Sequence, residues 1–302
     1  MSFTFRFFAM LSVLGWLADT LWVFDLRQNR LALISPARTL ARTVVAPTSA
    51  RPIPTDSARI PPFPMIIPMA TYPDGSFYAG LFISSTQVVP AGFKSGVAYG
   101  RITADRIVQK IVAVASESGS NHSVRGGGST ASLPFVSSSA QAISQDGSRS
   151  AIAIPVDAGA DSAEVRVTTF DAEGDTIFSR QYQVEGIPIP RAVGDSVIEA
   201  RASELQQRSP ELAAAVRREA RVPKFYPPIE GLLIGRDGTV WVQLPNRNDA
   251  RAYLVIDANG GALGTLQFPR TARLAAAQRD RIWLLERDEN DVQSIVRYRA
   301  DW

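Results

Sequence analysis

Short apolar runs alternate with polar turns along the whole chain, and one kind of turn recurs. Five turns contain an aspartate and precede a strand-like run that is apolar or aromatic. They are Ala18-Asp19-Thr20, Pro73-Asp74-Gly75, Gln145-Asp146-Gly147, Arg236-Asp237-Gly238 and Arg279-Asp280-Arg281. Glycine, which follows the aspartate in three of them, reaches positive φ without a Cβ clash. Each turn therefore predicts a hairpin of two antiparallel strands.

A further apolar or alternating run follows each hairpin and predicts a third strand. These runs cover residues 30–35, 97–103, 165–170, 251–256 and 294–298. Two units continue through another turn into a fourth strand, at residues 176–182 and 262–268. The repeated unit is thus a four-stranded antiparallel meander.

Such sheets present two faces, so a series of them buries its apolar side chains by stacking face against face. We therefore predict an all-β chain, a single β-propeller domain over residues 1–302 with five recognisable four-stranded units. A β-sandwich is the rival, but sandwiches do not repeat one turn in five successive hairpins. The last unit lacks a fourth strand of its own, and we expect residues 2–8 to pair beside the strand at 294–299.

The repeat resembles a known family. Asp237-Gly238-Thr239-Val240-Trp241-Val242, followed by Asp257-Ala258-Asn259-Gly260 after the next strand, is similar to NHL-type six-bladed β-propellers. Residues 14–25, 225–228 and 283–298 also resemble uncharacterised bacterial members. The resemblance implies six blades, so this chain, with five visible units, lacks one.

The first 18 residues allow two interpretations. Their apolar stretch is either a signal peptide or a mature β-strand, and it falls short of the ~20 apolar residues that span a bilayer. We therefore predict no transmembrane span. We expect an extracytoplasmic location, periplasmic or secreted.

Residues 191–223 interrupt the β pattern and predict a helical insertion. We expect two short helices divided near Ser209, which is suited to be an N-cap before Pro210 at the first helical position and Glu211 in the first turn. The insertion is interpreted as a cap on a propeller face, with a lid over the central channel as the alternative.

Residues 117–132 are rich in glycine and serine and predict a flexible loop. The chain's one histidine, His122, lies in this loop. A single histidine forms neither a multi-histidine metal site nor a triad without placed partners. We therefore assign it no catalytic role.

Composition and charge exclude several classes of function. Hydrophobic residues make up 45% and charged residues 20%, which is typical of a globular protein with a core. The net charge is only +3 and the basic residues are scattered, so we expect no nucleic-acid partner. Because the chain has no cysteine, disulfides, thiolate nucleophiles and cysteine-ligated metals are excluded. We expect a monomer.

Two groups of side chains are candidates for chemistry or for the core. The acidic cluster of Glu286, Asp288, Glu289 and Asp291 is interpreted as a solvated hairpin loop; calcium in a central channel, as the resemblance to lactonase-type propellers implies, is the alternative. The tryptophans that follow the turns are interpreted as core between sheets. They are Trp22, Trp241 and Trp283.

No motif identifies a catalytic residue or a cofactor, and propellers carry very diverse functions. The interpretation we favour is a non-enzymatic binding propeller for an unknown small molecule or protein partner. Phe225, Tyr226 and Arg297 are the candidates for binding residues. A metal-dependent lactonase-type hydrolase and a structural module of a larger assembly are the alternatives.

Overall fold

The structure is a computed structural model of the whole chain. It describes residues 12–17, 20–25, 30–37, 39–45, 66–72, 74–83, 96–103, 105–116, 123–137, 139–156, 163–246, 250–289 and 292–302. The chain divides into two compact units. The first contains Met1–Ser116, Ile143–Ser150 and Phe170–Asp175, and the second contains Glu117–Ala142, Ala151–Thr169 and Thr176–Trp302.

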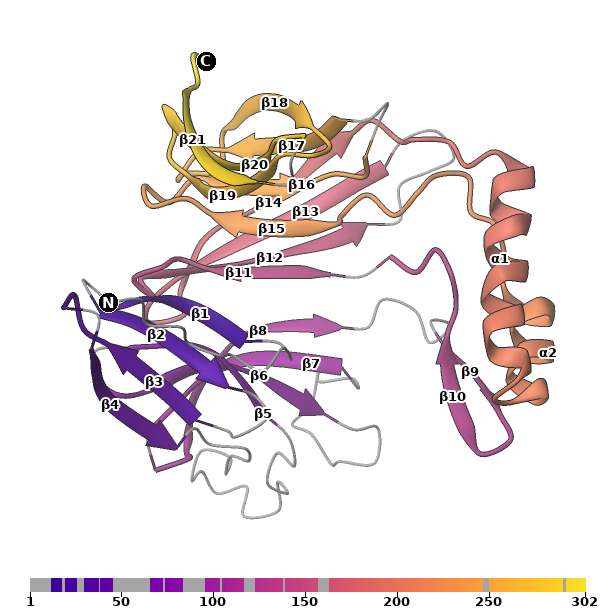
Figure 1. Cartoon of the computed structure of the whole chain (residues 1–302), viewed down its shortest axis with the longest axis horizontal. Helices are drawn as coiled ribbons and strands as arrows, with labels where there is room; N and C mark the ends of the chain where they lie inside the picture. The colour runs from indigo at the N-terminus through magenta and orange to yellow at the C-terminus, as the bar shows by residue number, and fades with distance from the viewer. Residues whose placement is uncertain are drawn as a thin grey trace. The chain divides into compact units, whose positions relative to one another are not determined.

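The strands of the described residues form successive antiparallel meanders, whose order in each sheet follows the order in the chain (Figure 1). The first sheet consists of β1 (Ser12–Leu17), β2 (Thr20–Asp25), β3 (Arg30–Ile34) and β4 (Leu40–Val45). The second consists of β5 (Ile66–Thr71), β6 (Phe77–Ile83), β7 (Gly96–Ile102) and β8 (Val108–Ser116). A separate hairpin follows, β9 (Ser123–Gly126) and β10 (Ser129–Ser132).

Three more sheets complete the series. The third consists of β11 (Ala140–Ile143), β12 (Arg149–Val156), β13 (Ala163–Asp171) and β14 (Thr176–Val184). The fourth consists of β15 (Gly231–Ile234), β16 (Val240–Gln243), β17 (Ala250–Ile256) and β18 (Ala262–Pro269). The last has three strands, β19 (Arg273–Ala277), β20 (Arg281–Arg287) and β21 (Gln293–Arg299). Five meanders in series confirm the predicted β-propeller class and all five predicted third strands.

The Asp-Gly turns have a common construction. In the turn before β6, the Tyr72 N–H donates to the Ser76 carbonyl, and the Gly75 N–H donates to the Tyr72 carbonyl. Gly75 has φ +81°. This is a three-residue hairpin loop with glycine in the left-handed region, longer than the tightest hairpins.

The aspartate holds this turn from inside. One oxygen of Asp74 accepts hydrogen bonds from the Ser76 N–H at 2.9 Å and the Ser76 hydroxyl at 2.6 Å. Asp146 with Ser148 and Asp237 with Thr239 repeat both bonds. We call this pair of hydrogen bonds a turn lock. It stabilises the turn by itself, so the repetition of the Asp-Gly-Ser/Thr sequence needs no bound ligand to explain it.

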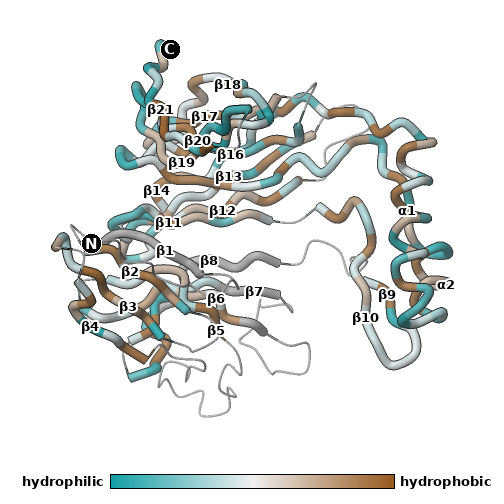
Figure 2. The backbone as a smooth tube through the Cα atoms, viewed as in Figure 1, coloured by the Kyte–Doolittle hydropathy of each residue, from teal (hydrophilic) through white to brown (hydrophobic). Residues whose placement is uncertain are grey.

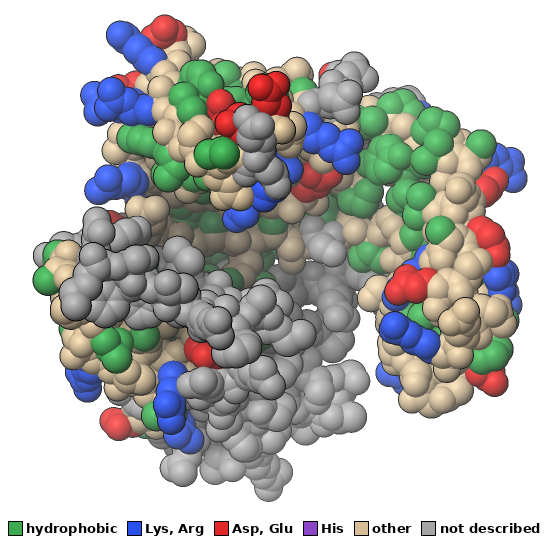
Figure 3. Space-filling view, in the orientation of Figure 1, with side chains coloured by type: hydrophobic (Ala, Val, Ile, Leu, Met, Phe, Trp, Pro, Cys, Tyr) green, Lys and Arg blue, Asp and Glu red, His purple; other side chains and the backbone are tan. Residues whose placement is uncertain are grey.

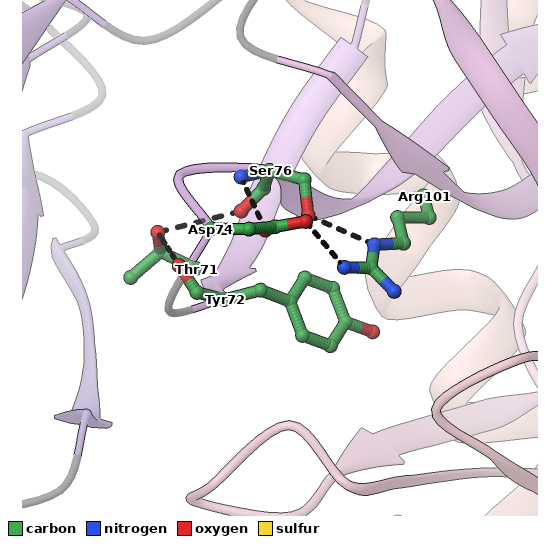
Figure 4. Close-up of polar contacts among 5 residues, drawn as sticks. All are labelled: Thr71, Tyr72, Asp74, Ser76 and Arg101. Carbon is green, nitrogen blue, oxygen red and sulfur yellow. Dashed lines mark hydrogen bonds and ion pairs between the residues drawn. The ribbon is translucent and has the colours of Figure 1, made fainter.

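Arg101 on β7 completes the lock in the second sheet (Figure 4). Its Nη2 donates to Asp74 at 2.6 Å, its Nε donates to the Ser76 hydroxyl at 2.8 Å, and the guanidinium lies 4.4 Å from the centre of the Tyr72 ring. Burial raises the pKa of Tyr72 to about 12. These partners are satisfied within the sheet, so we assign the cluster a structural role.

Two apolar layers lie in the second unit. One packs the third sheet against the fourth, with Val165, Val167 and Val240 fully buried. The other packs the fourth sheet against the last, around Trp241 and Val255. Figure 2 shows the hydrophobic segments of these strands.

The predicted burial of the tryptophans is confirmed for two of the three, and for Trp241 the predicted position between two sheets is confirmed as well. Trp241 is 0% exposed and Trp22 is 4% exposed, whereas Trp283 is only half-buried. Trp283 stays accessible because it lies on the face of the last sheet that points away from the fourth sheet. The face of each sheet, not the residue type, decides the burial.

The helical insertion contains α1 (Arg191–Gln206) and α2 (Pro210–Glu219). The predicted division is confirmed, because the Ser209 side chain accepts a hydrogen bond from the Leu212 N–H and Pro210 begins α2. No helix in the described part of the chain is long and apolar enough to cross a membrane.

The prediction of a loop over residues 117–132 is wrong for its described part, because β9 and β10 pair as a hairpin beside α2 (Figure 1). Val124 and Ala131 are buried with Leu212 and Val216 in one apolar cluster. Gly126 allows the close approach, since a Cβ there would lie 2.9 Å from the backbone of Glu211. The hairpin and the helices thus form a small module with its own core.

Some predictions fall on residues outside the described part. The pairing of residues 2–8 beside β21, the location of His122 in a loop, and the choice between a signal and a strand for residues 1–11 all stay predictions. From residue 12 onward the stretch forms β1, paired with β2. That residues 1–302 form one domain also stays a prediction.

Candidate binding site on the last sheet

An open groove of about 500 Å³ lies between the end of β18 and the last sheet. Its apolar wall includes Phe268, Ile282 and Leu284. Its polar rim consists of Glu286, Arg287, Tyr298 and Arg299 with Gln267 and Thr271. A groove that is mostly apolar with a few polar groups at its rim is typical of a binding site.

The strand register explains why these side chains share one face. Ile282 pairs with Tyr298, and Leu284 pairs with Val296. Side chains of directly paired residues lie on the same face of a sheet. Ile282 and Leu284 are 2% exposed within the layer against the fourth sheet, so the groove is the outer margin of that layer.

The groove runs beside an unpaired strand edge. Among the described strands, β21 pairs with β20 alone, although the corresponding strands β3, β7, β13 and β17 each pair on both sides. The side of β21 that faces away from β20 therefore has no β-ladder in the described structure.

Two hydrogen bonds show which backbone groups point to that edge. The Ala300 N–H donates to the Asp280 carbonyl, and the Asp288 N–H donates to the Val292 carbonyl. In an antiparallel pair, bonded and non-bonded positions alternate. The even-numbered residues of β21 therefore bond to β20, and the odd-numbered ones direct N–H and C=O outward. The outward residues are Gln293, Ile295, Arg297 and Arg299.

The face of the last sheet that points away from the groove is rich in arginine. Arg281 pairs with Arg299, and Trp283 pairs with Arg297. A second hollow of about 510 Å³ is lined by these three arginines with Asp280 and Tyr298. Figure 3 shows basic side chains gathered at this end of the chain, near the C-terminus.

The charges of the hollow are only partly compensated. Arg281 lies 3.5 Å from Asp280, and Arg299 lies 3.1 Å from Asp301. Arg297 forms no ion pair or hydrogen bond with any described residue. On the opposite face, the Tyr298 hydroxyl donates to Glu286 at 2.6 Å, and this bond raises the pKa of Tyr298.

The structure places only one of the three predicted binding residues at this site. Arg297 lines the second hollow, whereas Phe225 and Tyr226 lie between α2 and β15 and line neither hollow. The Phe225 ring covers Gly186, and the Tyr226 ring meets the Phe135 ring edge-on at 6.1 Å. These contacts hold a connection in place, and a binding role for the two aromatics stays a prediction.

The acidic cluster is only partly the predicted hairpin loop, because Glu286 lies on β20 and is half-buried, where its carboxylate accepts a hydrogen bond from the Tyr298 hydroxyl. Asp288 and Glu289 are exposed, and Asp288 accepts a hydrogen bond from the Val292 N–H. Asp291 lies outside the described residues. Within those residues, no three histidine, aspartate or glutamate side chains gather as a metal site would require. Calcium in a central channel stays a hypothesis from the sequence.

The sequence predicted that the last unit lacks a fourth strand, as the described structure has it, but sequence reasoning missed the paired arginines. The signal was present, because Arg297 and Arg299 alternate with Tyr298 as residues on one face of a strand do. The pairing of Arg281 with Arg299 needed the register, which the alternation alone does not give.

The comparisons with known proteins identify neither a family nor a function for this chain. No protein family matches the sequence, and no curated protein matches it. A DUF4221 family member from Bacteroides vulgatus is similar in structure, with 10% identity, a TM-score of 0.37, and coverage of 94% of this chain and 76% of the other. A protein of unknown function from Bacteroides caccae has 12% identity, a TM-score of 0.34, and coverage of 90% and 69%.

A glucose dehydrogenase has 12% identity, a TM-score of 0.33, and coverage of 95% of this chain and 84% of the other. Likenesses this distant transfer no function to the present chain. The propeller class rests on the five meanders, and the resemblance to NHL-type propellers stays a prediction.

Proposed function

We propose that this chain is a non-enzymatic binding protein that holds an extended segment of a partner protein along β21. The single observation that carries the proposal is the edge of β21 beside an apolar groove, with which no other described strand pairs. An added strand would satisfy the outward backbone groups and place alternate side chains in the groove. Strand addition of this kind is a general mode of peptide recognition, in which the backbone supplies affinity and the pockets supply specificity.

The solvent exposure of β21 supports a role as a binding surface. Six of its seven residues are exposed, and Ile295, a large apolar side chain, is 69% exposed. An exposed apolar residue on an open edge favours association. The arginines on the strand have a second consequence, since charged side chains on an edge oppose unspecific aggregation. The arginines therefore restrict which segments pair with β21, but they do not prevent pairing.

Two other occupants compete with a partner segment. A second copy of the chain would bring the arginines of both β21 strands together, and like charges directly opposite are unfavourable. Residues 2–8 of this chain, which lie outside the described residues, are the occupant that the sequence predicts. If either one fills the edge, free peptides will not bind.

The test is a selection of random twelve-residue peptides on the immobilised full chain, followed by affinity measurement of the enriched peptides. Ile295→Pro removes one outward N–H and leaves the bonds to β20 intact, whereas the control Ile295→Ala shortens the side chain and keeps that N–H. We expect Kd to rise about tenfold more in Ile295→Pro than in Ile295→Ala, as loss of a backbone bond in the complex requires.

Absence of any enriched peptide, or equal binding by both variants, would overturn the proposal. Size-exclusion chromatography separates the competing occupants. A dimer that Ile295→Pro dissolves would assign the edge to a second copy, and a monomer whose edge opens only after removal of residues 2–8 would assign it to the chain itself.

The extracytoplasmic location is part of this proposal, and fractionation of cells that produce the full chain tests it. No observation in the described residues favours the lactonase-type hydrolase or the purely structural module. The open edge beside the groove favours the binding of an extended segment over both of them.

A further inference from the structure

The two faces of the last sheet differ in chemistry, and a strand added to β21 would meet both. One face carries the apolar groove with Phe268 and Leu284. The other face carries Arg281, Arg297 and Arg299, which line the second hollow; Arg299, at the end of the strand, also lines the groove. Because successive side chains of a strand point to opposite faces, every second residue of an added strand would meet arginine.

We infer that the segment held by β21 alternates between apolar and acidic residues, with its carboxylates bound by Arg297, Arg299 and Arg281. This inference rests on the proposed function and deepens it by naming the chemistry of the partner. The apolar side chains enter the groove, and the carboxylates lie over the arginine face. The partner is therefore recognised by the alternation of apolar and acidic residues along its strand and by its negative charge.

Two arginines of like charge are paired on this face. Arg281 and Arg299 are directly opposite at a non-hydrogen-bonded position, where paired side chains approach most closely. Two guanidinium groups there repel each other in the free protein. A carboxylate between them removes the repulsion and forms two charge-assisted interactions.

The three arginines of this face have fewer carboxylates near them than they could bind. The two carboxylates that pair with this cluster, Asp280 and Asp301, each engage one arginine, and both ion pairs are exposed to solvent. Arg297, on the same face two residues before Arg299 and opposite Trp283, has no such partner among the described residues. Its five N–H donors are available to a carboxylate, which a guanidinium binds in a bidentate fork.

Two of the arginines lie on the open edge of β21. Arg297 and Arg299 are two of the four residues whose backbone groups point to the open edge. A partner strand bonded to those groups would have side chains directly opposite each arginine. Acidic residues spaced two apart thus face arginines spaced two apart, and no rearrangement of β21 is needed.

The experiment uses four fluorescein-labelled peptides with the full chain at 0.05 M and 0.3 M salt. The first alternates valine and glutamate over eight residues, and the second replaces each glutamate by glutamine. The third has the composition of the first in two blocks, four valines and then four glutamates. The fourth is a peptide enriched by the selection described above. The protein variants are Arg297→Gln and, as a matched control far from β21 in the sequence, the exposed Arg191→Gln on α1.

We expect the alternating acidic peptide to bind at least tenfold more tightly than its glutamine form at low salt. Arg297→Gln removes most of that difference, Arg191→Gln keeps it, and higher salt reduces it, as exposed ion pairs require. Thermal melting of both variants shows whether they are folded.

Each other outcome contradicts a defined part of the argument. If the selected peptide binds while the acidic and glutamine peptides are equal, the arginine inference is wrong and the proposed function stands. If the block peptide equals the alternating one, the attraction is unspecific charge and the inference is wrong. If no peptide binds, including any from the selection, both the inference and the proposed function are overturned.

Discussion

The fourth and last sheets show how one local sequence pattern leads to two different surroundings. Trp241 and Trp283 each follow the first pair of their hairpin, Ile234 with Val240 and Ala277 with Ile282. Trp241 is completely buried, and its indole N–H donates to the Thr239 hydroxyl at 3.0 Å. Trp283 is half-buried.

The difference arises from what lies across the sheet. Trp241 lies opposite Val255, and its ring meets the rings of Tyr253 and Trp302 at 6.5 and 6.2 Å. Trp283 lies opposite Arg297. The fourth sheet has a core against its neighbours on both faces, whereas among the described residues the last sheet contributes one face to a core. The repeated turn therefore determines the position of a tryptophan in its hairpin, and the neighbouring sheets determine whether that tryptophan is buried.

The largest test of this comparison is the pair Trp241→Ala and Trp283→Ala. Truncation of Trp241 removes a fully buried ring and its hydrogen bond, which should lower the free energy of unfolding by about 3 to 5 kcal/mol. Trp283→Ala should lower it by about 1 to 2 kcal/mol, because a half-buried ring has less apolar area to lose. Urea denaturation with a common slope measures both.

Equal losses in the two variants would contradict the comparison, since they would mean that the exposed face of the last sheet is covered. A loss below about 1 kcal/mol for Trp241→Ala would contradict the assigned core. Trp283→Phe is the matched control for ring size, and it should change the free energy of unfolding less than Trp283→Ala does.

A second test contrasts the two sides of β21. Val296→Pro removes an N–H that bonds to β20 and should cost about 3 kcal/mol in unfolding free energy, whereas Ile295→Pro removes an outward N–H and should cost less than about 1 kcal/mol. Thermal and urea unfolding compare the two variants. Similar losses would show that the outward side of β21 is paired, and the proposed docking edge would then not exist.

The meanders could be predicted because their signals are local. Asp237-Gly238-Thr239 closes its own turn, and the apolar run of β17 is buried along nearly its whole length. Ser209 likewise caps α2 with its own side chain. Where a short stretch of sequence contains both partners of an interaction, the element follows from the sequence.

The hairpin of β9 and β10 could not be predicted in this way. Its burial depends on two small apolar residues, Val124 and Ala131, whose partners lie on α2, far away in the sequence. A glycine- and serine-rich composition predicts a loop unless those partners are known. Gly126, which suggested mobility, instead allows the close approach to the backbone of Glu211, and Gly127 has a positive φ of 56° in the turn.

The candidate site falls between these two cases. Arg297 was a candidate from the sequence, but the opposite position of Arg281 depends on register, and the open edge depends on which strands are neighbours. Phe225 and Tyr226 were candidates because aromatics beside prolines are typical of exposed patches. Their contacts with Gly186 and Phe135 show how a connection uses the same residue types for packing.

The smallest test compares two tyrosines whose pKa values are raised for different reasons. In the fourth sheet, burial raises the pKa of Tyr253. In the last sheet, the hydrogen bond to Glu286 raises the pKa of the exposed Tyr298. A raised tyrosine pKa stabilises the folded state below the unfolded value, about pH 10, and this contribution is lost as the pH rises through the folded pKa.

Glu286→Gln should therefore lower the pKa of Tyr298 toward its ordinary value and leave that of Tyr253 unchanged, because removal of the carboxylate removes the charge that opposes phenolate formation. Nuclear magnetic resonance of ring-labelled tyrosine, over a pH range that brackets about pH 10, follows each residue separately, with Tyr298→Phe to assign the signal. The free energy of unfolding should fall with rising pH above about pH 10 in the original protein, and the part due to Tyr253 should persist in Glu286→Gln. A change in the pKa of Tyr253 in that variant would show that the surroundings of Tyr253 in the fourth sheet depend on Glu286 in the groove. An unshifted Tyr298 would show that burial, and not Glu286, controls the rim of the groove, and the last sheet would then resemble the fourth more closely than its exposure indicates.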